Sequence, residues 1–134
     1  MATLDDAATV ALELPEVVEG TGRSGRSWSV GGKTFAWERP FSKADLKRFG
    51  DAPVPSLPIL AVRVDDLGEK EAVLAADQKG FFTIPHFDGY AAVLIELRAV
   101  GKRPLRAAIV DGWAACAPAD LVAEHQRGAS RRRR

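Results

Sequence analysis

The stretch RSGRSWSVGGKTFAWERP, residues 23–40, decides the fold. Two short runs of β-forming residues, 28–30 and 34–37, flank Gly31–Gly32, and a glycine pair in this position signals a two-residue hairpin turn. Alternation along the two strands predicts that six side chains share one face of this hairpin in opposed pairs. The predicted pairs are Val30 with Lys33, Trp28 with Phe35, and Arg26 with Trp37.

Helices are expected on both sides of the hairpin. Thr3 followed by Asp6 resembles a capping box, and apolar residues then recur at helical spacing until Pro15. Further helices are predicted over 66–76, 104–116 and 118–126, and strands over 59–64, 81–84 and 90–99. The helix at 104–116 is expected to bury a stripe of residues at helical spacing: Leu105, Ala108, Ile109, Gly112, Trp113 and Cys116. The order α-β3-α-β2-α predicts an α+β two-layer sandwich, with an antiparallel sheet and helices packed on one of its faces.

Length and composition limit the kind of protein. A chain of 134 residues fits one domain, so we expect a single domain over 1–126 and a basic, disordered tail over 127–134. Cys116 is the only cysteine, which excludes an internal disulfide and favours a small buried side chain over a reactive thiol. The longest apolar run, 90–95, is too short to cross a bilayer, and no signal-peptide pattern opens the chain. We therefore expect a cytoplasmic protein without membrane contact, as a monomer or weak dimer.

Positive charge gathers in two places, although the formal net charge is only +1 and four of the basic residues are the final arginines. Around the hairpin lie Arg23, Arg26, Lys33 and Arg39. A second group, Arg98, Lys102, Arg103 and Arg106, surrounds the predicted start of the helix at 104. Cations spaced along a hairpin can meet phosphates, and the major groove admits a two-stranded ribbon. Solvated cations around a buried aromatic cluster are the alternative interpretation.

A third group of polar residues lies in the irregular segment 80–89 and just after it. His86 near Asp88 and Tyr90 is a pattern that can support acid–base chemistry or bind a small ligand. The chain carries none of the common nucleophile or zinc-binding motifs. We therefore expect no catalysis, no metal and no cofactor, and a loop histidine bonded to backbone is the simpler reading of His86.

Several segments taken together resemble the MmcQ/YjbR family of small bacterial proteins. The matching stretches are ALELPEVVEGT at 11–21, SWSVGGKTFAW at 27–37, LAVRVDD at 60–66, FFTIPHFDGY at 81–90 and DGWAACAPADL at 111–121. The resemblance implies a fold like that of CyaY or of secretion chaperones. It also implies DNA binding through protruding strands called a double wing. The chain departs from the family at GRSGR, 22–26, where members often carry a Tyr-Gly or similar pair.

These observations lead to one expectation and two alternatives. The protein is predicted to bind DNA through the phosphate backbone, with the hairpin cations as the first surface and the group around Arg98 and Lys102 as the second. A protein-binding adaptor that uses an exposed sheet face or edge is the main alternative. A small-ligand site formed by His86, Asp88 and Tyr90 is the other.

Overall fold

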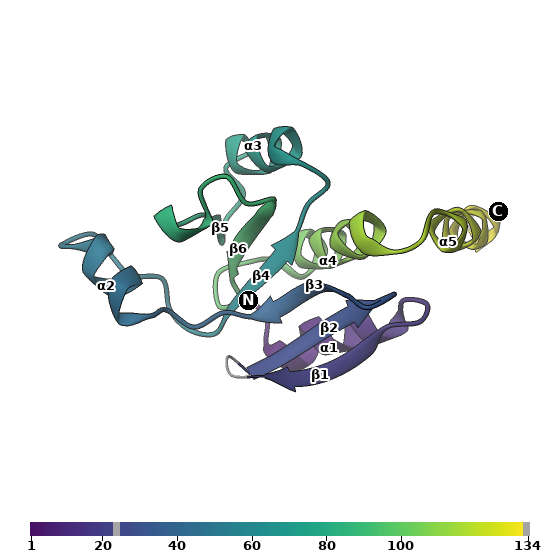
Figure 1. Ribbon diagram of the computed structural model, residues 1–134, viewed down its shortest axis with the longest axis horizontal. Coiled ribbons are helices and arrows are strands. Elements are labelled where there is room, and N and C mark those ends of the chain that lie inside the picture. Colours follow the sequence, from purple (N-terminus) through teal and green to yellow (C-terminus); the bar gives the residue numbers. More distant parts are fainter. Residues whose placement is uncertain (23–24, 133–134) are drawn as a thin grey trace.

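The computed structural model describes residues 1–22 and 25–132, with side chains up to Gly128. An antiparallel sheet of six strands, in the order β1-β2-β3-β4-β6-β5, forms its centre (Figure 1). The strands are β1 Val18–Gly22, β2 Gly25–Val30, β3 Lys33–Glu38, β4 Ile59–Arg63, β5 Phe81–Phe82 and β6 Ala92–Glu96. The helices are α1 Leu4–Glu13, α2 Lys43–Phe49, α3 Leu67–Ala75, α4 Lys102–Cys116 and α5 Ala119–Arg132, with a 3-10 turn, η1, at Pro85–Phe87. The predicted α+β class is confirmed.

The order of elements differs from the predicted one. Strand β1 precedes the hairpin, helix α2 separates β3 from β4, and α5 follows α4 as a further helix, whereas α3 lies between β4 and β5 as predicted. Helix α5 continues to Arg132, whereas a disordered tail was predicted from residue 127. No helix in the described residues is long and apolar enough to span a membrane.

Helices α1 and α4 cover one face of the sheet and enclose the main core. Trp28, Phe35 and Trp113 are fully buried there, and Cys116 is 8% exposed, as expected for a small core residue. Gly112 lets α4 approach the strands closely, because a Cβ at this position would lie 2.6 Å from a methyl carbon of Val62. The capping box that opens α1 is present, with the Asp6 amide donating to Thr3 and the Thr3 amide to Asp6.

The opposite face of the sheet carries a second, smaller core. Ile59, Ala61 and Leu94 are buried under η1 and the segment around α2, whose Phe41 and Phe49 rings meet edge to face at 5.3 Å. The prediction that helices pack on one face only is therefore wrong. This layer covers β4, β6 and β5, whereas Ser27, Ser29 and Thr34 of the β2–β3 hairpin remain half-buried or exposed on the same face.

A β-bulge in the hairpin changes the predicted register. Val30 pairs with Lys33 as predicted, but Trp28 opposes Ala36, and Ser27 opposes Trp37. The extra residue at the bulge allows both Phe35 and Ala36 to be buried in the main core. Consequently Trp37 points to the opposite face, where it packs against the second core. The prediction of six side chains on one face is therefore wrong.

Candidate functional site

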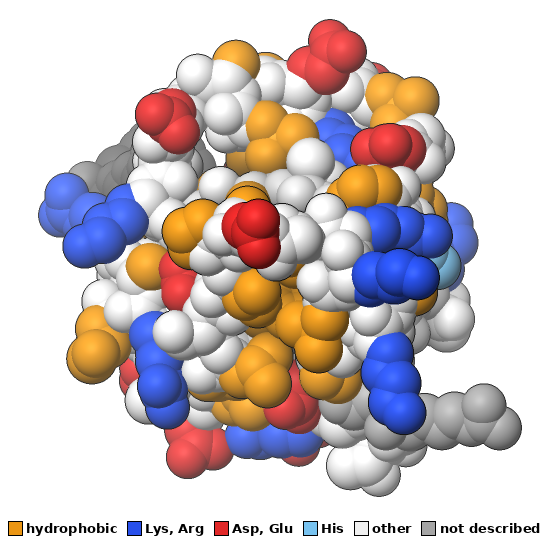
Figure 2. All heavy atoms as spheres, turned by 90° about the vertical axis from the view of Figure 1, so that its left-hand side faces the viewer, with side chains coloured by type: hydrophobic (Ala, Val, Ile, Leu, Met, Phe, Trp, Pro, Cys, Tyr) orange, Lys and Arg blue, Asp and Glu red, His pale blue; other side chains and the backbone are white. Residues whose placement is uncertain are grey.

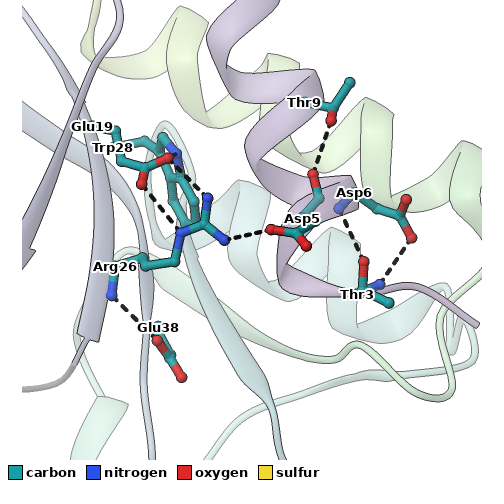
Figure 3. Close-up of polar contacts among 8 residues, drawn as sticks. All are labelled: Thr3, Asp5, Asp6, Thr9, Glu19, Arg26, Trp28 and Glu38. Atoms are coloured by element: carbon teal, nitrogen blue, oxygen red, sulfur yellow. Dashed lines mark hydrogen bonds and ion pairs between the residues drawn. The ribbon is translucent and has the colours of Figure 1, made fainter.

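Arg26, predicted to meet phosphate, is held by the protein's own carboxylates (Figure 3). Its Nη1 donates to Asp5 at 2.9 Å, and its Nε and Nη2 donate to the two carboxylate oxygens of Glu19 at 3.2 and 3.1 Å. The indole N–H of Trp28 donates to the same Glu19 at 2.9 Å. The hydrogen bonds from Arg26 and Trp28 lower the pKa of Glu19, and Arg26 has the larger effect. Arg26 therefore ties α1 to the β1–β2 hairpin.

Arg39 lies on the other face of the sheet and also has a carboxylate partner. Its Nη2 donates to buried Asp45 at 3.0 Å, and its guanidinium lies 5.7 Å from the centre of the Phe87 ring. Burial alone would raise the pKa of Asp45, but hydrogen bonds from Ser42 and the charge of Arg39 outweigh burial and lower it. Arg26 and Arg39 thus do not form a common surface.

Lys33 is the predicted hairpin cation that remains exposed at the turn. Within the residues that the structure describes, it makes no ion pair. Arg23 lies outside the described residues.

The second basic group is exposed but lies away from Lys33. Lys102, Arg103 and Arg106 border a shallow hollow between α1 and α4, and Arg106 donates to Glu13 at 3.1 Å. Lys33 lies beside Ala115 and Cys116, at the opposite end of α4. A helix of 15 residues is about 22 Å long, so the two basic groups do not form one surface. Arg98 is exposed and does not line this hollow.

Two adjoining hollows bring other cations together with aromatic rings, one beside the end of α4 and the other beside η1 on the second face. One, of about 530 Å³, is lined by Lys33, Thr34, Trp37, Arg63, Tyr90, Ala115 and Cys116. The other, of about 290 Å³, is lined by Trp37, Arg39, His86, Phe87 and Tyr90. Because Trp37 and Tyr90 line both, we treat the hollows as one site, the Trp37–Tyr90 groove.

Aromatic rings form the floor of this groove. The Trp37 and Tyr90 rings lie 6.3 Å apart with a tilt of 52°, and Phe87 lies 6.4 Å from Trp37 and 5.5 Å from Tyr90. Arg63 lies beside Tyr90, with its guanidinium 5.3 Å from the ring centre and its Nη1 donating to the hydroxyl at 3.2 Å. A cation thus sits directly against the aromatic floor.

The elements that form the groove are distant in sequence. Trp37 comes from β3 and Arg63 from the last position of β4, where alternation places it on the same face as Ile59 and Ala61. Phe87 and Tyr90 come from the turn after β5, which Lys70 of α3 holds by donating from its Nζ to the Phe87 carbonyl at 2.5 Å and the Tyr90 carbonyl at 2.8 Å. Lys70 is only 7% exposed, and burial lowers its pKa while the charge of Asp88 opposes that shift.

The electrostatic character of the groove is positive. No Asp or Glu among the described residues lines either hollow. Among the residues that the structure describes, neither Arg63 nor Lys33 has an ion-pair partner. The buried Nε of Arg63 has no hydrogen-bond partner among them either. A planar, negatively charged ligand fits such a surface best.

The groove includes parts of two of the three predicted groups, together with Arg63 and Phe87, which the sequence did not single out. Lys33 and Arg39 come from the predicted hairpin surface, and His86 and Tyr90 from the predicted small-ligand site, while Asp88 is exposed and lines neither hollow. Arg63 was missed, although a lone cation that alternates with Ile59 and Ala61 is a usable signal. No three His, Cys, Asp or Glu side chains of the described ranges are grouped so as to hold a metal ion.

Comparisons with known proteins identify relatives without a described activity. No protein-family model and no solved structure matches the chain. The uncharacterised proteins Rv2570 and MT2646 of Mycobacterium tuberculosis and Mb2600 of Mycobacterium bovis are each 44% identical to it over 125 residues. The matched region covers 91% of this chain and 94% of each relative. The chain belongs to the same family as these uncharacterised mycobacterial proteins.

Proposed function

We propose that the protein binds nucleic acid, DNA foremost, through the Trp37–Tyr90 groove and without catalysis. One observation carries the proposal: Lys33 and Arg63, which have no carboxylate partner among the described residues, flank an aromatic floor that no carboxylate lines. Cations in such a position attract phosphates, and exposed rings accept bases. The resemblance to the MmcQ/YjbR family, which remains part of this proposal, supports the same partner.

The proposal assigns different roles to the predicted phosphate-binding residues. Lys33 contacts phosphate together with Arg63. Arg39 contributes less, because Asp45 offsets its charge. Arg26 acts as a structural residue, since its guanidinium is already bonded to two carboxylates. The exposed group of Arg98, Lys102 and Arg103 lies too far away to share the groove's ligand.

The experiment is a salt titration of binding to short labelled DNA, measured by fluorescence anisotropy. Lys33→Gln and Arg63→Gln each remove one cation of the groove, while Lys102→Gln and Arg103→Gln remove matched cations at the far end of α4. Each groove variant is expected to weaken binding and to lower the slope of log affinity against log salt by about one unit, because one phosphate contact is lost. The control variants are expected to leave the affinity and the salt slope unchanged.

Two outcomes contradict the proposal. If the control variants weaken binding and the groove variants do not, the α4 group is the interface. If no variant alters affinity or slope, the groove does not bind nucleic acid. Arg63→Lys keeps the charge and is expected to retain the salt slope, which separates loss of charge from disturbance of β4.

A protein-binding role is the second candidate, favoured by exposed apolar side chains in the segment that carries α2. Leu46, Val54 and Leu57 are 46%, 44% and 51% exposed. Figure 2, which faces this end of the molecule, shows hydrophobic side chains gathered in the middle of the face. A second copy of the chain is the simplest partner. Sedimentation should then show a concentration-dependent dimer that Leu46→Glu abolishes, and a monomer at every concentration contradicts this role.

A further inference from the structure

We infer that the Trp37–Tyr90 groove selects single-stranded nucleic acid, with an unpaired base lying on Trp37 while Lys33 and Arg63 hold the adjacent phosphate. This inference rests on the proposed function and deepens it. The proposed function does not say whether the groove binds a single strand or a duplex, because both present phosphates to the cations. The inference concerns this choice.

Trp37 differs from the other two tryptophans of the chain in ways that leave it available to a ligand. Trp28 and Trp113 are fully buried, and their indole N–H groups donate to Glu19 and to the Pro15 carbonyl. Trp37 is half-buried, lines both hollows, and makes no hydrogen bond from its indole N–H to the described residues. Its ring is therefore both a stacking surface and an unused donor.

The shape of the groove favours a base that has left the stack. The Trp37 and Tyr90 rings line both hollows, beside Lys33 and the end of α4 in one and beside His86 and Phe87 in the other. In a duplex the faces of the bases are covered by their neighbours, and only edges are presented in the grooves. A duplex would therefore meet the cations at the rim and leave the rings unused, whereas a single strand can reach them.

The tilt between the rings determines how bases are received. At 52° and 6.3 Å between centres, Trp37 and Tyr90 form an open corner and not a parallel slot. A base therefore lies on one ring at a time. Cations border the floor in both hollows, with Lys33 and Arg63 in one and Arg39 in the other. A strand that crosses the shared rings meets positive charge on both sides.

The experiment uses the intrinsic fluorescence of tryptophan in the full chain. Because Trp28 and Trp113 are buried, a ligand that stacks in the groove quenches Trp37 selectively. Four probes are compared at one salt concentration: oligothymidylate, an abasic strand of the same length, a duplex of that length, and thymidine monophosphate. Oligothymidylate is expected to quench and to bind more tightly than the abasic strand by roughly 5-fold to 150-fold per stacked base. The duplex is expected to bind more weakly and without quenching.

Two variants connect the signal to Trp37. Trp37→Phe is expected to abolish the quenching and to keep part of the preference for oligothymidylate over the abasic strand, since a ring remains. Trp37→Leu is expected to abolish the preference while leaving the salt slope intact. Thermal unfolding of both variants verifies that they remain folded.

The outcomes separate this inference from the proposed function. If duplex and abasic strand bind as tightly as oligothymidylate, with groove-dependent salt slopes and no quenching, the inference is wrong and the proposed function stands. Equal affinity for the monophosphate and the strand also overturns it, because the site is then a nucleotide pocket. If no probe binds, both fail.

Discussion

Two corners of this molecule use the same residue types and differ in what surrounds them. At the first, Arg26 lies 5.5 Å from the ring centre of Trp28, bonded to Asp5 and Glu19, and the ring is fully buried. At the second, Arg63 lies over Tyr90 beside Trp37, and no carboxylate lines the hollows there. The comparison teaches that an arginine beside an aromatic ring has a structural role where carboxylates and burial complete its contacts. Where no carboxylate pairs with the arginine, the same combination indicates a ligand-binding site.

The largest expected effect comes from removing the buried ring of this pair. Trp28→Ala leaves a cavity in the main core and removes one of the hydrogen bonds to Glu19, and it should lower the free energy of unfolding by about 3–5 kcal/mol. Trp37→Ala should cost clearly less, because its ring is only half-buried. Urea unfolding measures both. Equal costs would mean that Trp37 is a core residue and that the comparison is false.

A smaller effect is expected from Lys70, which holds the turn on which Phe87 and Tyr90 lie. Lys70→Met keeps the length of the side chain and removes both carbonyl hydrogen bonds, so the turn should loosen and oligonucleotide binding should weaken about tenfold, a change of about 1.4 kcal/mol in binding free energy. Burial lowers the pKa of Lys70, so its charge already costs stability, and removing the charge offsets part of the stability that is lost with the two hydrogen bonds. Lys79→Met, at an exposed position of the following loop, is the matched control. Unchanged binding in Lys70→Met would show that the turn is set by other contacts.

The smallest effect concerns Glu19 and should appear in stability and not in binding. Glu19→Gln weakens the contacts to Arg26 and Trp28 at a partly exposed site and should cost about 1 kcal/mol at neutral pH. Because folding lowers the pKa of Glu19 below 4.5, its contribution is present above that pH and is lost as the pH falls through the lowered value. The difference in unfolding free energy between the wild-type protein and Glu19→Gln should therefore shrink in acid. A difference that is independent of pH would mean that the carboxylate charge is not what stabilises this corner.

The parts of the fold that were correctly predicted depend on contacts between near neighbours in sequence. The Thr3–Asp6 capping box and the Gly31–Gly32 turn, whose glycines adopt φ of 58° and 78°, each involve only a few residues. The buried stripe of α4 follows from helical periodicity alone. Such features are decided locally, so the amino acids present are sufficient to identify them.

The site was predicted only in fragments, because it depends on one bulged residue and on pairings between distant strands. Without the bulge between Trp28 and Ser29, Trp37 would share a face with Trp28 and the groove would lose its floor. Arg63 reaches Tyr90 because β4 pairs with β6, which lies about 30 residues further along the chain.

The amino-acid sequence by itself determined the α+β class, the hairpin turn, the buried character of α4 and the presence of cations near aromatic residues. Only the tertiary structure decided which arginines are bonded to carboxylates and which tryptophan remains accessible. The physical reason is that hydrogen bonding and periodicity within an element act over a few residues. Burial and charge pairing depend on segments that meet only when the sheet is assembled.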